Sequence, residues 1–125
     1  MVSSGERTRR DGNWWLGQTE FFKTSYVLGM FDGVQLGRYF IVRAVKSSAD
    51  TEKISALSLS TENEQLLMSN VTVGQVQAGL DDFYQDYKNR KTESIDAVEV
   101  VLEGAAGMPK DQLEKFVLNL EAVRL

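Results

Sequence analysis

The chain has 125 residues, with 14 Lys and Arg against 18 Asp and Glu, so its formal net charge is −4. It contains no Cys and no His, which excludes a thiol nucleophile, an imidazole base for a serine triad and the preferred ligands of structural zinc. The acidic balance argues against a nucleic-acid-binding face, which needs a basic surface. With 42% hydrophobic and 26% charged residues, the composition is that of a single globular domain.

The chain has no stretch of roughly 18 uninterrupted apolar residues, the length that a membrane helix needs. The best candidate, residues 26–45, carries charges that include Asp32 and Arg43, so we expect no membrane span. The polar start lacks the apolar segment of a signal peptide, and we interpret residues 1–17 as a flexible polar leader before a single helical domain at 18–125. Two compartments remain open: periplasmic or secreted if an export signal is missing from this chain, and otherwise cytoplasmic.

The first part of the domain predicts one long helix and a weaker helical region. Thr19 stands where a helix N-cap would, and apolar residues follow at helical spacing to about Val45. The segment 47–71 is rich in Ser, and its Thr61-x-x-Glu64 pattern resembles a capping box. We expect one or two short helices and a loop there.

The second part predicts three helices with clear boundaries. Thr72-x-x-Gln75 opens a helix that should end near Asn89, and another should run from about Ser94 to the glycines at 104–107. Pro109 suits the first turn of the last helix. The side chains expected to point inward are Val73, Val76, Leu80, Phe83, Tyr84, Tyr87, Ile95, Val98, Val101, Leu102, Leu113, Phe116, Val117, Leu120 and Val123. The sequence therefore predicts an all-α fold, a compact single-domain bundle of about four to five helices.

The long first helix is apolar on two opposite sides. On one side Gly29, Gly33 and Gly37 recur every four positions, and each costs a helix roughly 1 kcal/mol relative to Ala. We expect another helix backbone or a bulky ring to approach this face closely and offset that cost. A second apolar strip lies opposite and consists of Val27, Phe31, Val34, Val42 and Val45. Either the helix is the central core of the bundle, or this second strip meets a partner or a second copy of the chain.

Carboxylates are the main candidates for catalysis or metal binding. Asp81, Asp82 and Asp86 are close in sequence, and hard cations prefer carboxylate oxygens. Asp82 and Asp86, however, fall on the side of their helix away from the apolar stripe. We interpret them as a solvated face, with Asp86 paired to Arg90 four residues later.

Two other features have both structural and binding interpretations. Asp32 lies at the margin of the glycine face, where we expect it to accept a hydrogen bond from Gln75, Arg90 or a backbone N–H. Trp14 and Trp15 suit a ligand-stacking pair or a peptide anchor, but we favour a hydrophobic lid over the bundle.

Short motifs along the chain carry a family resemblance. They are Tyr26-x-x-Gly29-x-x-Asp32, then Val71-Thr72-Val73-Gly74-Gln75, then Gly-Leu-Asp-Asp-Phe-Tyr-Gln-Asp-Tyr-Lys-Asn-Arg at residues 79–90, then Ala97. Together they resemble the helical Rap/Tai-type immunity proteins of bacterial type VI secretion and other small exported bacterial all-helical proteins. The resemblance implies an all-helical domain, export to the periplasm and, in the immunity branch, inhibition of a peptidoglycan amidase by binding. The cysteines and signal peptide of that branch are absent from this chain.

These observations favour a non-enzymatic protein-interaction domain of bacterial type that binds a protein partner or itself, with no cofactor, no metal and no nucleic acid. The alternative is a small carboxylate-based hydrolase or metal-dependent enzyme, with Asp32, Asp82 and Asp86 gathered in a cleft at raised pKa values. The residues expected to form the interaction or structural motif are Trp14, Tyr26, Gly29, Phe31, Asp32, Gly33, Gln75, Asp86, Asn89 and Arg90.

Overall fold

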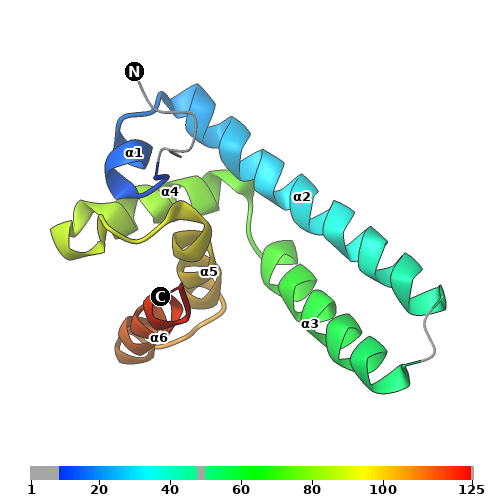
Figure 1. The fold of residues 1–125 in the computed structure, drawn as a ribbon. Coiled ribbons are helices and arrows are strands. Elements are labelled where there is room, and N and C mark those ends of the chain that lie inside the picture. Colours follow the sequence, from blue (N-terminus) through cyan, green and yellow to red (C-terminus); the bar gives the residue numbers. More distant parts are fainter. Residues whose placement is uncertain (1–8, 48–49, 125) are drawn as a thin grey trace, which may run out of the picture.

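The structure is a computed structural model that describes residues 9–47 and 50–124. These residues form six α-helices and one short 3-10 helix, with no strand among them, which confirms the all-α prediction (Figure 1). In chain order the elements are α1 (Gly12–Leu16), α2 (Glu20–Ser47), α3 (Thr51–Ser69), α4 (Val73–Gln85), η1 (Tyr87–Asn89), α5 (Ser94–Ala105) and α6 (Lys110–Arg124). None of the helices in the described ranges is long and apolar enough to cross a membrane.

The helices form two parts, which we call the arm and the body. The arm is the antiparallel pair α2 and α3, and the body consists of α1, α4, α5 and α6. The first half of α2 packs on α4 in the body, whereas its second half runs outward beside α3 (Figure 1). Within the body, α5 packs against both α4 and α6, and it also touches α3. The body therefore anchors one end of the arm.

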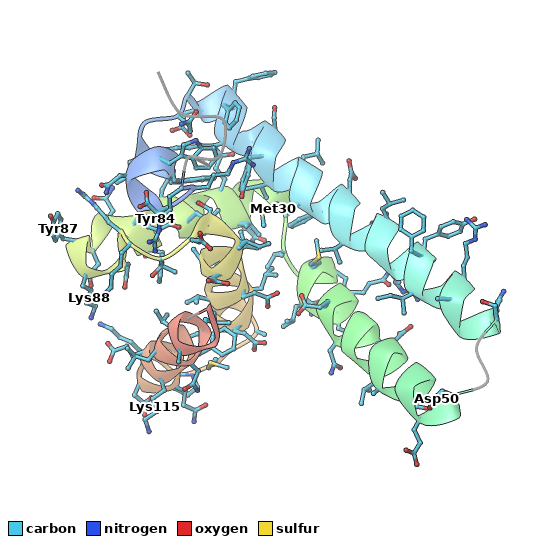
Figure 2. The ribbon with its side chains drawn as sticks, viewed as in Figure 1. Met30, Asp50, Tyr84, Tyr87, Lys88 and Lys115 are labelled. Carbon is cyan, nitrogen blue, oxygen red and sulfur yellow. The ribbon has the colours of Figure 1, made fainter. Side chains whose placement is uncertain are left out.

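The hydrophobic core lies where α1, α2, α4 and α5 meet. Its buried members are Trp15, Val27, Val76, Leu80, Tyr84, Ala97, Val98 and Leu102. Figure 2 shows Tyr84 within the body and Tyr87 projecting from it. Tyr87 was expected to point inward, but α4 ends before it and the residue is 80% exposed. Ile95, in the first turn of α5, is also exposed rather than inward.

Local capping explains several of the helix boundaries. Thr72 and Gln75 form the predicted capping box: the Thr72 hydroxyl accepts from the Gln75 N–H at 3.1 Å, and the Gln75 side chain accepts from the Thr72 N–H at 2.9 Å. The Thr19 hydroxyl accepts from the Phe22 N–H at 3.1 Å and caps α2 as expected. After α5 the chain turns at Gly107, whose φ of +105° is unfavourable for any residue with a Cβ.

Three boundaries differ from the sequence-based predictions. One is the end of α4, which lies at Gln85 rather than near Asn89. The predicted flexible leader over residues 1–17 is wrong for residues 12–16, which form α1, while residues 1–8 lie outside the described ranges. α1 is held because Asp11 caps it and the Gly12 N–H donates to the Arg90 carbonyl at 2.8 Å. The short helices expected over residues 47–71 are one helix, α3. Packing along α2 stabilises this helix although its own apolar spacing is weak.

Candidate functional site

The most unusual surface of the protein lies on α2. Of the twelve large apolar residues that are exposed in the described ranges, seven belong to this one helix. We name its solvent-facing apolar side the outer face, made of Phe22, Leu28, Gly29, Gly33, Leu36, Tyr39 and Phe40. Side chains project from α2 on the side away from α3 (Figure 2). Monomeric proteins rarely expose so contiguous an apolar surface unless it binds something.

The glycines of α2 lie on this open side. A Cβ added at Gly29, Gly33 or Gly37 would meet nothing within 4 Å. The predicted close approach of another helix or ring within the chain is therefore wrong. α3 and α4 pack against the other side of α2, so the helix is not the central core of the bundle.

Part of the second apolar strip of α2 is covered by the protein itself, but Val42 is 40% exposed and the Val45 side chain lies outside the described residues. Val27 is fully buried in the core, and Phe31 is partly buried against it. Val34 and Phe31 also line a small cavity between α2 and α3, together with Met68. The hypothesis that this strip meets a partner or a second copy is therefore wrong for these residues. Apolar spacing identified two sides of α2 correctly but could not say which side the rest of the chain would cover.

The aromatic residues near the start of α2 form one packed group. The Trp14 ring lies 5.2 Å from the Tyr26 ring and 5.8 Å from the Phe22 ring, centroid to centroid, in edge-on arrangements. The Arg10 guanidinium sits 5.4 Å from the Trp14 centroid. Burial raises the pKa of Tyr26, and the Arg10 charge opposes that shift. Trp15 lies inside the core rather than over it as a lid. Through Phe22, this group is continuous with the outer face.

An ion pair between a buried lysine and a partly exposed aspartate joins the arm to the body. Lys23 on α2 has a side chain only 7% exposed, and its Nζ lies 2.8 Å from Oδ1 of Asp81 on α4. The same Asp81 oxygen accepts a hydrogen bond from Trp15 Nε1 at 2.8 Å. Burial by itself lowers the pKa of Lys23, but Asp81 and, more weakly, Glu20 raise it above its ordinary value. The sequence interpretation missed this pair, although a lysine in register with the inward strip was a signal for it.

The segment 79–90, which carried much of the family resemblance, is mainly structural. A Cβ at Gly79 would lie 2.6 Å from Cγ1 of Val101, so glycine allows α4 and α5 to pack closely. At the other end, the Asn89 side chain donates to the Phe83 carbonyl at 2.9 Å. Arg90 Nε donates to the carbonyl of Tyr84, which follows Phe83, at 3.2 Å. Asn89 and Arg90 therefore satisfy carbonyls at the end of α4.

Asp86 has a similar local role. Its carboxylate accepts from the Lys88 N–H at 3.2 Å and caps η1. The expected ion pair with Arg90 is not formed among the described residues, and the Asp86 carboxylate lies 3.6 Å from Lys88 Nζ instead. The helix ends at Gln85, so the i to i+4 geometry that predicted the Arg90 pair does not exist.

Asp32 does not have the structural role expected for it. Gln75 and Arg90 bond to Thr72 and to Tyr84, respectively, rather than to Asp32. Asp32 is exposed on α2, and within the described residues it has no hydrogen bond or ion pair. Its side chain therefore stands in solvent beside the outer face.

The three acids proposed for an enzyme are not brought together. Asp82 and Asp86 line an open groove of about 670 Å³ between α4, α5 and α6, whereas Asp32 is on α2. The groove is also lined by Lys88 and Lys91, by further charged residues and by apolar residues. In the described ranges no three acids are placed to hold a metal ion. The arrangement is not the cleft of clustered acids that the enzyme alternative requires.

A different acid, Glu99, is perturbed. Glu99 on α5 is partly buried, and burial followed by the nearby Glu64 of α3 raises its pKa to about 7. Glu103 and Asp96 on the same helix add to this shift. Glu99 and Glu64 belong to the contact of α3 with α5, where the arm meets the body. Sequence inspection missed it because two residues 35 positions apart carry no joint local pattern.

Comparison with protein-family models, with curated proteins and with solved structures gives no match to this chain.

Proposed function

We propose that this protein is a non-enzymatic protein-interaction domain whose binding surface is the outer face of α2. The observation that carries the proposal is the concentration of exposed apolar side chains on this one helix. Leu36, Tyr39 and Phe40 are each more than half exposed. Burying such side chains against a partner is favourable by about 25 cal/mol for each Å² removed from water.

The arrangement of the arm supports the same proposal. The body fixes the first half of α2 through the core and the Lys23–Asp81 ion pair. A helix held in this way presents a preorganised surface, and preorganisation lowers the entropy lost on binding. Glycines without neighbours within 4 Å leave room for a partner to approach the backbone of α2.

A narrower form of this proposal is an immunity-type role. The resemblance to Rap/Tai-type immunity proteins supports a bacterial binder of a secreted effector, and a peptidoglycan amidase is the effector class that it implies. The first test is whether a secreted amidase gene lies next to the gene of this chain, and the second is coexpression of the two proteins. Survival of cells that make both proteins, lost on replacing Phe40 by Glu, supports the immunity role. Lysis of cells that make the amidase with the unaltered chain contradicts it.

The general proposal is tested by site-specific photocrosslinking in cells that produce the chain. A photoreactive residue replaces Leu36 on the outer face, and a matched control replaces Ile95 on α5, since the two are 55% and 54% exposed. We expect a discrete protein adduct from position 36 only, and its loss when Phe40→Glu is added. Equal adducts from both positions, or an adduct indifferent to Phe40→Glu, would contradict the proposal.

A further inference from the structure

We propose that the occupant of the outer face is a second copy of this chain, bound antiparallel across α2 in a two-fold homodimer. This inference rests on the proposed function and names its partner. The dimer uses the side of α2 opposite to the strip that Val27 and Phe31 occupy within the monomer.

The spacing along the outer face suits helix pairing. Apolar or small residues recur at intervals of four, three, four, three and four, which is the heptad seam of two packed helices. The seam consists of Phe22, Tyr26, Gly29, Gly33, Leu36 and Phe40. Its members lie on α2 from the first turn to well beyond the body. The seam is therefore long enough for extended contact between two arms.

The seam is complementary to itself. It is bulky at both ends and minimal in the middle, so an antiparallel copy centred at position 31 places Phe22 opposite Phe40 of the partner subunit. The same register places Gly29 opposite Gly33 of the partner subunit. Because both glycines are exposed and open, the two backbones can approach there while the aromatic rings pack on either side. Self-complementarity of this kind is what a two-fold interface requires.

The charge on the face also favours a second copy over an unlike, charged partner. Between Phe22 and Phe40 the helix carries three charged residues. Lys23 is buried, and Arg38 is paired with Glu62 at 3.0 Å. Of these three residues, only Asp32 is exposed and without an ion pair within the described ranges. A face with so little charge is complementary to another apolar face, and this chain itself supplies one.

The available area is sufficient for a dimer. The outer face holds five large side chains that are 44% to 58% exposed: Phe22, Leu28, Leu36, Tyr39 and Phe40. At roughly 200 Å² for each whole side chain, they contribute on the order of 500 Å² per copy. If the exposed parts of these side chains are all covered, two copies bury about 1,000 Å² before backbone and polar atoms are added, which is the lower limit for a specific interface.

The test is sedimentation velocity on the full chain over a range of concentrations. We expect a species of twice the 14.0 kDa chain mass that dissociates on dilution. Phe40→Glu should weaken the dimer at least tenfold. Leu118→Glu, which changes a residue 64% exposed on α6, should leave it unchanged. A monomer at every concentration, or equal loss in both variants, overturns the inference.

Gly33→Leu provides an independent test because it separates the dimer from the stability of the monomer. Its Cβ meets nothing within 4 Å in the monomer, and Leu is a better helix former than Gly. The variant should keep its helical circular dichroism, yet it should weaken the dimer at least tenfold by filling the close contact. An intact dimer in Gly33→Leu overturns the antiparallel glycine contact.

The two proposals fail in different ways. If the chain is monomeric but position 36 still crosslinks a different protein in a Phe40-dependent way, the homodimer is wrong and the interaction function stands. If neither experiment detects a partner, both are wrong. An adduct of twice the chain mass supports both.

Discussion

Replacing Glu99 by Gln should make the stability of this protein less dependent on pH between about 5 and 8. Glu99 lies on α5, where burial and the carboxyl of Glu64 on α3 raise its pKa to about 7 from the ordinary 4.5. Among the described residues, the charged groups that raise its pKa are acidic: Glu64 from α3, with Glu103 and Asp96 from its own helix. The folded protein therefore binds a proton at Glu99 that the unfolded chain has already lost.

The direction of the pH effect follows from this difference. Since the folded state holds the extra proton, raising the pH through the interval between the two pKa values destabilises it. The full difference between about 7 and 4.5 corresponds to about 3 kcal/mol. Glu99 is only partly buried, so water screens the repulsion and we expect about 1–2 kcal/mol. Gln keeps a neutral donor for Glu64 and should regain that stability above neutral pH.

Urea unfolding followed by circular dichroism at a series of pH values measures this effect. The unaltered protein should lose stability as the pH rises toward 8, and Glu99→Gln should flatten the curve. Glu52→Gln, an exposed acid on α3, serves as the matched control and should leave the slope unchanged. A pH slope retained in Glu99→Gln would refute the reasoning. If dimerisation contributes to stability, all three proteins are compared at one chain concentration.

Two further changes probe how the body is held together. Gly12→Ala should lower the free energy of unfolding by about 2–3 kcal/mol, because its Cβ would lie 2.8 Å from the Arg90 Cα. The control Gly17→Ala, whose Cβ would be 3.6 Å from its nearest neighbours, should change it by less than about 0.5 kcal/mol. Similar losses in both variants would contradict the packing argument. Asp81→Leu should cost about 2–3 kcal/mol in urea unfolding, because the buried Lys23 ammonium keeps only Glu20, at 3.4 Å, and Trp15 Nε1 loses its acceptor. Adding Lys23→Met should restore the part of the loss that comes from the buried charge. No recovery in the double variant would show that the loss does not come from that charge.

Features that depend on neighbouring residues were predicted well. The capping box of Thr72 and Gln75, the start of α2 after Thr19 and the α5 turn at Gly107 each involve bonds or backbone angles within a few residues. Such interactions act on the same short stretch that the sequence displays. α3 was predicted poorly because its stability comes from packing on α2 rather than from its own pattern.

The candidate surface was only half predictable. The sequence showed that α2 has two apolar sides, one with Gly29 and Gly33 and the other with Val27. It could not show that α3 and α4 would cover the Val27 side, and so the roles expected for the two sides were reversed. The contacts of Lys23 with Asp81 and of Glu99 with Glu64 were missed for the same reason.

By itself, then, the sequence determined an all-α chain, the starts of α2, α4 and α5 and a chemistry without thiol or imidazole groups. Only the tertiary structure decided which face of α2 is open, because that choice depends on the free energy of packing helices far apart in sequence. Helical periodicity marks a face as apolar, but it does not mark which partner covers it. The open face of α2 is therefore the feature that the fold adds, and the proposed interaction depends on it.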